Sequence, residues 1–178
     1  MKDRIRIING IFLLLIISLT GCKKDSGEMP DFAAKGTIQA LVNNSQVITK
    51  SIITRAIKSD IDENYSFYTI QGSTGGREER IFIFSLTDIS VGTFPIGGEG
   101  NDKVKASFVQ TRIDTSFQDS IIVTSWEAPY GNQVVGQLNI IELSDEAIKG
   151  KFEYQASNKK DKSTIEVKSG SFNIELKK

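Results

Sequence analysis

Apolar and polar side chains alternate along the second half of the chain with a period of two residues. Between positions 148 and 156, Ile148, Phe152 and Tyr154 fall on one side of the alternation, and lysine and glutamate side chains fall on the other. Residues 171–176 alternate in the same way. Because successive side chains of a β-strand point to opposite faces, both segments are predicted to be strands with one buried and one solvated face.

The alternation changes phase between these two segments. Ile165 and Val167 lie in the opposite phase to Phe172. A slip of one residue would move every side chain of the strand to the wrong face. Ser169 and Gly170 must therefore absorb the extra residue, either as a β-bulge or as a tight hairpin turn, and we favour the bulge.

Two short runs, 81–84 and 121–123, are apolar at every position and predict central strands that are buried on both faces. About nine strands separated by turn-rich segments, with no alternating helices, predict an all-β fold: an antiparallel β-sandwich or, alternatively, a closed or partly open β-barrel. The remaining predicted strands lie near 35–42, 46–57, 65–71, 104–112 and 134–143.

The first residues have a different pattern. Lys2, Arg4 and Arg6 are followed by an almost wholly apolar run of about 13 residues, 7–19. This run is shorter than the roughly 20 residues that a membrane-spanning helix needs, and it has the length of the apolar region of a signal peptide. We therefore predict that residues 1–21 are a signal peptide.

The segment Leu19-Thr20-Gly21-Cys22 resembles a bacterial lipobox, in which small residues precede a cysteine that is lipidated and becomes the first residue of the mature protein. This resemblance implies a membrane anchor at Cys22; the alternative is an ordinary signal peptide followed by an unmodified cysteine. Residues 22–31 are then a lipidated cysteine with a flexible tether, and residues 32–178 a single β domain. Lys23, by resemblance to lipoprotein sorting rules, implies the outer membrane, at the cell surface or on the periplasmic face.

Composition excludes several kinds of chemistry. The chain carries 22 basic and 22 acidic residues, which disfavours a nucleic-acid partner. It has no histidine and one cysteine, so it can form neither a Ser-His-Asp triad nor a histidine-ligated zinc site nor an internal disulfide. Asp60, Asp62 and Asn64 begin like a calcium loop but lack its glycine and glutamate, so we predict no metal and no cofactor.

Three segments of the last third of the chain, 136–140, 148–154 and 170–174, are similar to strands of a family of small Bacteroidetes lipoproteins. They read G-x-x-x-I, I-x-G-x-F and G-x-F, and Gly92-Thr93-Phe94 is similar to a loop segment in the middle of that family's chain. The resemblance implies a β fold and an envelope location. It implies no particular chemistry.

Trp126 ends a predicted strand, and Tyr130, four residues on, lies in the turn between Pro129 and Gly131. Loops at strand ends carry function on many β scaffolds, and exposed aromatic side chains there stack on sugar rings or anchor a protein partner. The competing interpretation is that Trp126 closes one end of the core. We take Trp126 and Tyr130 as the candidate ligand-binding residues.

The predicted function is that of a lipid-anchored, noncatalytic envelope or cell-surface module that binds a glycan or a protein. One alternative is a purely structural envelope protein. The other is a carboxylate-based hydrolase using acids such as Glu127, Glu142 and Glu153, which requires two carboxylates about 5–9.5 Å apart. The sequence brings no two of these acids together.

Overall fold

The computed structural model describes residues 29–62, 65–116 and 120–177, and nearly all of them belong to β-strands or their connections. The predicted all-β class is confirmed. Within the described residues no helix has the length and apolar character needed to span a bilayer. The elements are β1 (Thr37–Val42), β2 (Ser45–Ile48), the 3₁₀ turn η1 (Ser51–Ile53), β3 (Arg55–Asp62), β4 (Tyr65–Ser73), β5 (Arg80–Thr87), β6 (Gly92–Gly97), β7 (Val104–Asp114), β8 (Ser120–Ala128), β9 (Val134–Leu143), β10 (Ala147–Ser157) and β11 (Thr164–Lys177).

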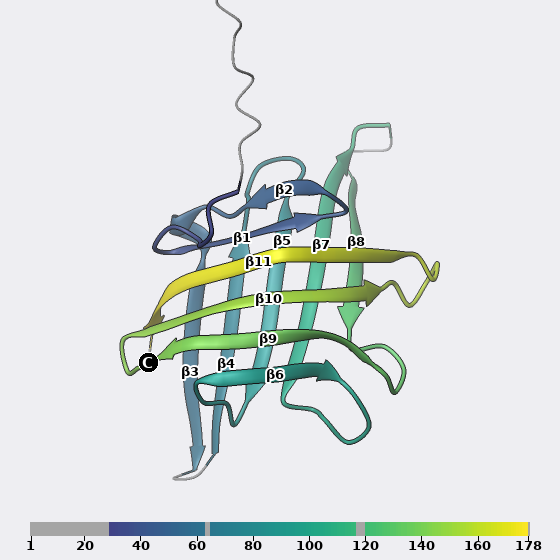
Figure 1. The fold of residues 1–178 in the computed structure, drawn as a ribbon. Helices are drawn as coiled ribbons and strands as arrows, with labels where there is room; N and C mark the ends of the chain where they lie inside the picture. Colours follow the sequence, from purple (N-terminus) through teal and green to yellow (C-terminus); the bar gives the residue numbers. More distant parts are fainter. Residues whose placement is uncertain (1–28, 63–64, 117–119, 178) are drawn as a thin grey trace, which may run out of the picture.

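The strands form two layers that cross at a steep angle (Figure 1). The first layer is the antiparallel series β3-β4-β5-β7-β8, and the second is β2-β1-β11-β10-β9-β6. All neighbours within each layer are antiparallel. Each layer therefore presents one face to the other layer and one face outward.

The two layers are joined at both sides, so that the eleven strands make one hydrogen-bonded sheet. On one side the last residues of β11 pair in parallel with β3, with Leu176 opposite Ala56. On the other side Ser157 of β10 pairs with Glu127 of β8. The structure thus keeps the two facing layers of the predicted sandwich and links them at two corners.

The segment 46–57, predicted as one strand, is broken in the structure into β2, η1 and β3. The prediction is wrong because threonine hydroxyls compete for the backbone at this point. The Thr49 Oγ1 accepts the amide hydrogen of Ile38 (2.9 Å) and lies 2.7 Å from Thr54 Oγ1, and Thr54 Oγ1 donates to the Lys50 carbonyl (2.8 Å). These bonds hold a turn that carries the chain from one layer to the other.

The phase change near Ser169 is a β-bulge, as predicted. Against β10, Phe152 pairs with Gly170 and Tyr154 with Val167, so that two residues of β11 oppose one residue of β10. Ser169 has a φ of 50°, in the left-handed region. The bulge lets Ile165, Val167 and Phe172 all face the core from one continuous strand.

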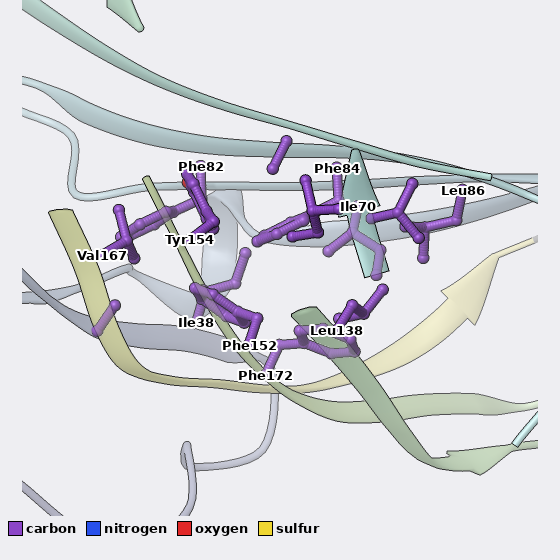
Figure 2. Close-up of a cluster of buried hydrophobic side chains, with 14 of the residues drawn as sticks. Ile38, Ile70, Phe82, Phe84, Leu86, Leu138, Phe152, Tyr154, Val167 and Phe172 are labelled. Carbon is purple, nitrogen blue, oxygen red and sulfur yellow. The ribbon is translucent and has the colours of Figure 1, made fainter. Parts of the chain in front are cut away.

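The core lies between the two layers and is rich in aromatic rings (Figure 2). Phe82 and Phe84 reach it from the first layer, and Phe152 and Phe172 from the second; all four are buried. The Phe84 and Phe152 rings have their centroids 4.7 Å apart, and the Phe152 and Phe172 rings are stacked at 6.1 Å. The alternation at 148–156 and 171–176 is thereby confirmed as a core-facing pattern.

The prediction that 121–123 is buried on both faces is wrong. Ile121 is 69% exposed and Val123 is 61% exposed. The reason is that β7 and β8 continue beyond β5: the β5–β7 pairing ends at Arg80 opposite Gln110, whereas the β7–β8 pairing continues to Asp114 opposite Ser120. In the run 81–84, only Phe82 and Phe84 are buried.

Candidate functional site

The N-terminal segment of the described chain lies across the outer face of the second layer. Gln39 Nε2 of β1 donates to the Pro30 carbonyl (2.6 Å), and the Ala33 amide donates to Ser171 Oγ of β11 (2.9 Å). The Lys149 ammonium lies 4.5 Å from the centre of the Phe32 ring. These contacts explain why Gln39 and Ser171, which point away from the core, are nevertheless buried.

The rest of this outer face is polar because the alternation of β9 and β10 places every second side chain outward. Lys151 pairs across the strands with Asn139, and Glu153 pairs with Gln137. On the other side of β9, Asn139 pairs with Thr93 of β6. Two adjacent rows of side chains therefore cross the strands. One row is Thr93, Asn139 and Lys151, and the other is Gln137 and Glu153.

Two hollows open on this face, and Glu153 lines both of them; we call the two hollows together the polar groove. The larger hollow has a volume of about 650 Å³ and the smaller about 340 Å³, within the range of small-molecule sites. The larger is bounded by the N-terminal segment, through Met29, Pro30 and Asp31, with Thr93, Gln137, Asn139 and Lys151 among its other residues. The smaller is lined by residues that include Tyr130, Gln133, Val134, Gln155, Glu166 and Lys168.

Hydrogen bonds and an ion pair hold several of these side chains in place. Gln137 Nε2 donates to Glu153 Oε1 (2.8 Å) between the two hollows, and the Tyr130 hydroxyl donates to Gln155 Oε1 (3.3 Å). Glu166 forms an ion pair with Lys168 (2.8 Å). The groove therefore presents planar groups whose orientation is set from neighbouring strands, each with further capacity to donate or accept.

Tyr130 and Trp126 do not share a site. Tyr130 is half-buried in the β8–β9 connection and lines the smaller hollow. Trp126, on β8, is half-buried against the core, with its ring centroid 6.1 Å from that of Phe108. Its indole Nε1 donates to Ser163 Oγ (3.0 Å) in the β10–β11 connection. Trp126 lines neither hollow of the polar groove.

Tyr154 contributes to the wall of the smaller hollow, yet its side chain belongs to the core. Its hydroxyl has no hydrogen-bond partner among the described residues. Burial raises the pKa of this hydroxyl well above its usual range, so the group stays neutral. Its position between aromatic rings makes it a packing residue (Figure 2).

The three glutamates considered for hydrolysis are spread over the fold. Glu127 is on β8 and forms an ion pair with Lys159 (2.6 Å). On the second layer, Glu142 of β9 pairs with Lys149 of β10. Lys149 and Glu153 are four residues apart along β10, which is about 13 Å at the rise of a strand. Glu142 and Glu153 therefore do not face each other as a cross-strand pair. Among the described residues no three His, Cys, Asp or Glu side chains cluster as metal ligands.

Cys22, the signal peptide and most of the predicted tether lie outside the described residues.

The amides Gln137 and Asn139 were missed by sequence reasoning. The alternation within 134–143 could have identified them, because Gln137 and Asn139 alternate with the buried Leu138 and Ile140 and must point to the outer face. Only the fold shows that the N-terminal segment turns this polar face into a groove.

Comparison with known proteins finds one family. Residues 35–174 match a domain family described as "Domain of unknown function (DUF6252)". No curated protein and no solved structure matches the chain. The matched region begins just before β1 and ends within β11, so it covers the two layers and the floor of the polar groove. The chain therefore belongs to the DUF6252 family.

Proposed function

We propose that this protein is a lipid-anchored, noncatalytic module of the cell envelope that binds a neutral glycan in the polar groove. The observation that carries the binding part is the pair of neighbouring hollows floored by the outward side chains of β9 and β10. A glycan presents hydroxyl groups that both donate and accept hydrogen bonds. The groove offers both kinds of partner: amides on Gln137 and Asn139, and the carboxylate of Glu153.

The charge of the groove favours a neutral ligand over a strongly acidic one. Its lining carries the carboxylates of Asp31, Glu153 and Glu166 against the ammonium groups of Lys151 and Lys168. A polyanion would meet a surface with no excess of positive charge. The aromatic ring of Tyr130 at one end supplies an apolar surface for a sugar ring, and its hydroxyl is already oriented by Gln155.

The groove is tested by binding of the detergent-solubilised full-length protein to a glycan array, repeated with the variants Asn139→Ala and Tyr130→Ala. Loss of one hydrogen-bonding amide or one stacking ring is expected to weaken binding of a captured glycan by about tenfold. Lys105→Ala, on the outer face of the first layer, serves as the control and should bind as wild type. Equal binding by all variants would contradict the groove, and cleavage of the captured glycan would favour a hydrolase instead.

The anchor part of the proposal is supported by the resemblance of residues 19–22 to a lipobox and by the sole cysteine at position 22. A mature lipoprotein of this kind carries two or three acyl chains, and each buried methylene adds about 0.8 kcal/mol, so the attachment is effectively permanent. The similarity to small Bacteroidetes lipoproteins and the residue Lys23 support the outer membrane as its location.

Cys22→Ser is expected to abolish labelling by a palmitate analogue and to release the protein from membranes into the soluble fraction. The readouts are in-gel detection of the label and the distribution of the protein between membrane and supernatant. The matched control is Lys24→Ser, which introduces the same side chain two residues away, keeps the cysteine and should stay on membranes. Continued labelling of the Cys22→Ser variant would contradict the lipid anchor.

A further inference from the structure

One end of the molecule combines exposed apolar side chains with an unusual use of arginine. We call it the arginine end, and it comprises the described residues 50–55, 73–80, 111–116 and 120–123. All four arginines of the described chain lie there, whereas basic residues elsewhere in the described domain are lysines. The four arginines are Arg55, Arg77, Arg80 and Arg112.

Backbone contacts show that these segments are neighbours. The Lys50 amide donates to the Ser73 carbonyl (2.8 Å), which ties η1 to the end of β4. The Thr111 amide donates to the Glu79 carbonyl (2.9 Å), which ties β7 to the β4–β5 connection. The Ile53 side chain lies against Gly75 in the same connection. The arginine end is therefore one contiguous surface.

Large apolar side chains project from this surface into solvent. Ile52 in η1 is 88% exposed, and the cross-strand pair Ile113 and Ile121 sits at the far end of the β7–β8 hairpin. Val123 lies on the same face of β8, two residues from Ile121, and is 61% exposed. Packing within the domain does not account for these side chains. Ile113, Ile121 and Val123 are neighbours and form one exposed apolar cluster, and such clusters mark contact surfaces.

The charge of the arginine end suits an anionic partner. Its described residues carry five basic side chains, Lys50 and the four arginines, against the acidic side chains of Glu78, Glu79 and Asp114. Two of these acids are engaged locally, Glu79 with the Ser73 hydroxyl and Asp114 with Ser116. Guanidinium groups bind phosphate through two parallel hydrogen bonds and lose hydration water more readily than ammonium groups.

The chain enters the domain at this same end. Figure 1 shows the first described residues beside β1 and β2, at the end of the molecule where β7 ends and β8 begins. Pro30 is held by Gln39, which pairs with the exposed Ile48 of β2, three residues before η1. Met29 follows Cys22 by seven residues, which span at most about 25 Å. This is less than the length of β7 alone, eleven residues or about 37 Å.

We propose that the arginine end docks on the lipid bilayer in which Cys22 is anchored, with Ile52, Ile113 and Ile121 entering the interface and the arginines contacting lipid phosphates. The inference rests on the proposed lipid anchor, because the short tether is what holds this end toward the membrane. Amphipathic surfaces that combine apolar and basic side chains bind bilayers in this way. Docking at this end leaves the polar groove, on the outer face of the second layer, open to solvent.

The test uses the full-length lipidated protein reconstituted in vesicles of phosphatidylethanolamine and phosphatidylglycerol. Since acylation blocks Cys22, Ile52→Cys supplies the only free thiol, which is labelled with an environment-sensitive fluorophore. The matched control is Val91→Cys, at a position that is 60% exposed and follows the opposite end of β5 from Arg80. We expect blue-shifted emission and quenching by spin-labelled lipid at position 52 but not at position 91.

A second variant tests the arginines. Replacing the exposed Arg77 and Arg112 together by glutamine, in the Ile52→Cys background, should lower the ratio of docked to undocked protein by about 30-fold. The effect should be smaller in vesicles of phosphatidylcholine alone, which offer phosphates but carry no net negative charge. Equal signals at positions 52 and 91, with Cys22 acylated, would overturn the docking and leave the anchor standing. A free, label-reactive thiol at Cys22 in the wild-type protein would overturn the anchor, and the docking with it.

Discussion

Phe152→Ala is expected to destabilise the domain by about 3–5 kcal/mol, because it removes the ring that connects the two layers of the core. Phe152 is 3% exposed, and its ring contacts those of Phe82, Phe84 and Phe172, with centroid distances from 4.7 to 6.1 Å. The cavity left behind would be lined from both layers and could not collapse without moving a whole sheet. Urea unfolding followed by the fluorescence of Trp126, the only tryptophan, measures the loss.

The control for this prediction is the adjacent residue. Lys151→Ala removes an exposed side chain whose ammonium lies 5.7 Å from the Phe32 ring, so its cost should not exceed about 1 kcal/mol. Similar losses at positions 151 and 152 would show that the inward and outward faces of β10 are wrongly assigned.

Gly136→Ala is expected to cost at least about 3 kcal/mol, at the upper end of what overpacking causes. Gly136 pairs with Tyr154 across β9 and β10. A methyl group at position 136 would lie 2.6 Å from the Tyr154 Cα and would also meet the Glu153 carbonyl oxygen. Because both obstacles are backbone atoms of β10, no side-chain rotation can relieve the contact, and the two strands must separate. Thermal unfolding followed by far-UV circular dichroism measures the effect.

Gly131→Ala provides the comparison. Gly131 lies in the β8–β9 connection with a φ of 68°, and a methyl group there would meet nothing within 4 Å. Its cost is only that of the left-handed backbone, about 1–2 kcal/mol. A smaller loss at position 136 than at position 131 would contradict the close approach of β9 to β10.

Local patterns were enough to predict the strands that lie over the core. Alternation over 148–156 and 171–176 identifies the inward residues Phe152 and Phe172, because a strand with one wet face must alternate. The opposite phase of Val167 predicts the bulge at Ser169, because a continuous strand can change phase only by adding a residue. Both features are properties of a single strand, so they can be read along the chain.

Features that depend on where a strand ends relative to its neighbours could not be predicted. The run 121–123 has the composition of a buried strand, yet Ile121 is exposed because β7 and β8 extend beyond the end of β5. The break in 46–57 depends on the Thr49 hydroxyl, which accepts a hydrogen bond from the amide of Ile38 on β1. In each case the deciding partner lies on another strand, and the propensity of the segment itself carries no information about that strand.

By itself the sequence determined that the chain folds as β-strands and which side chains of β10 and β11 face the core. Tertiary structure decided the rest. It placed Tyr130 in a groove and Trp126 against Phe108, although only three residues separate them, because β8, which carries Trp126, ends between them. It also brought four arginines from three segments together at one end of the molecule. Antiparallel strands alternate in direction, so every connection between the end of one strand and the start of the next lies at one of two ends of the layer.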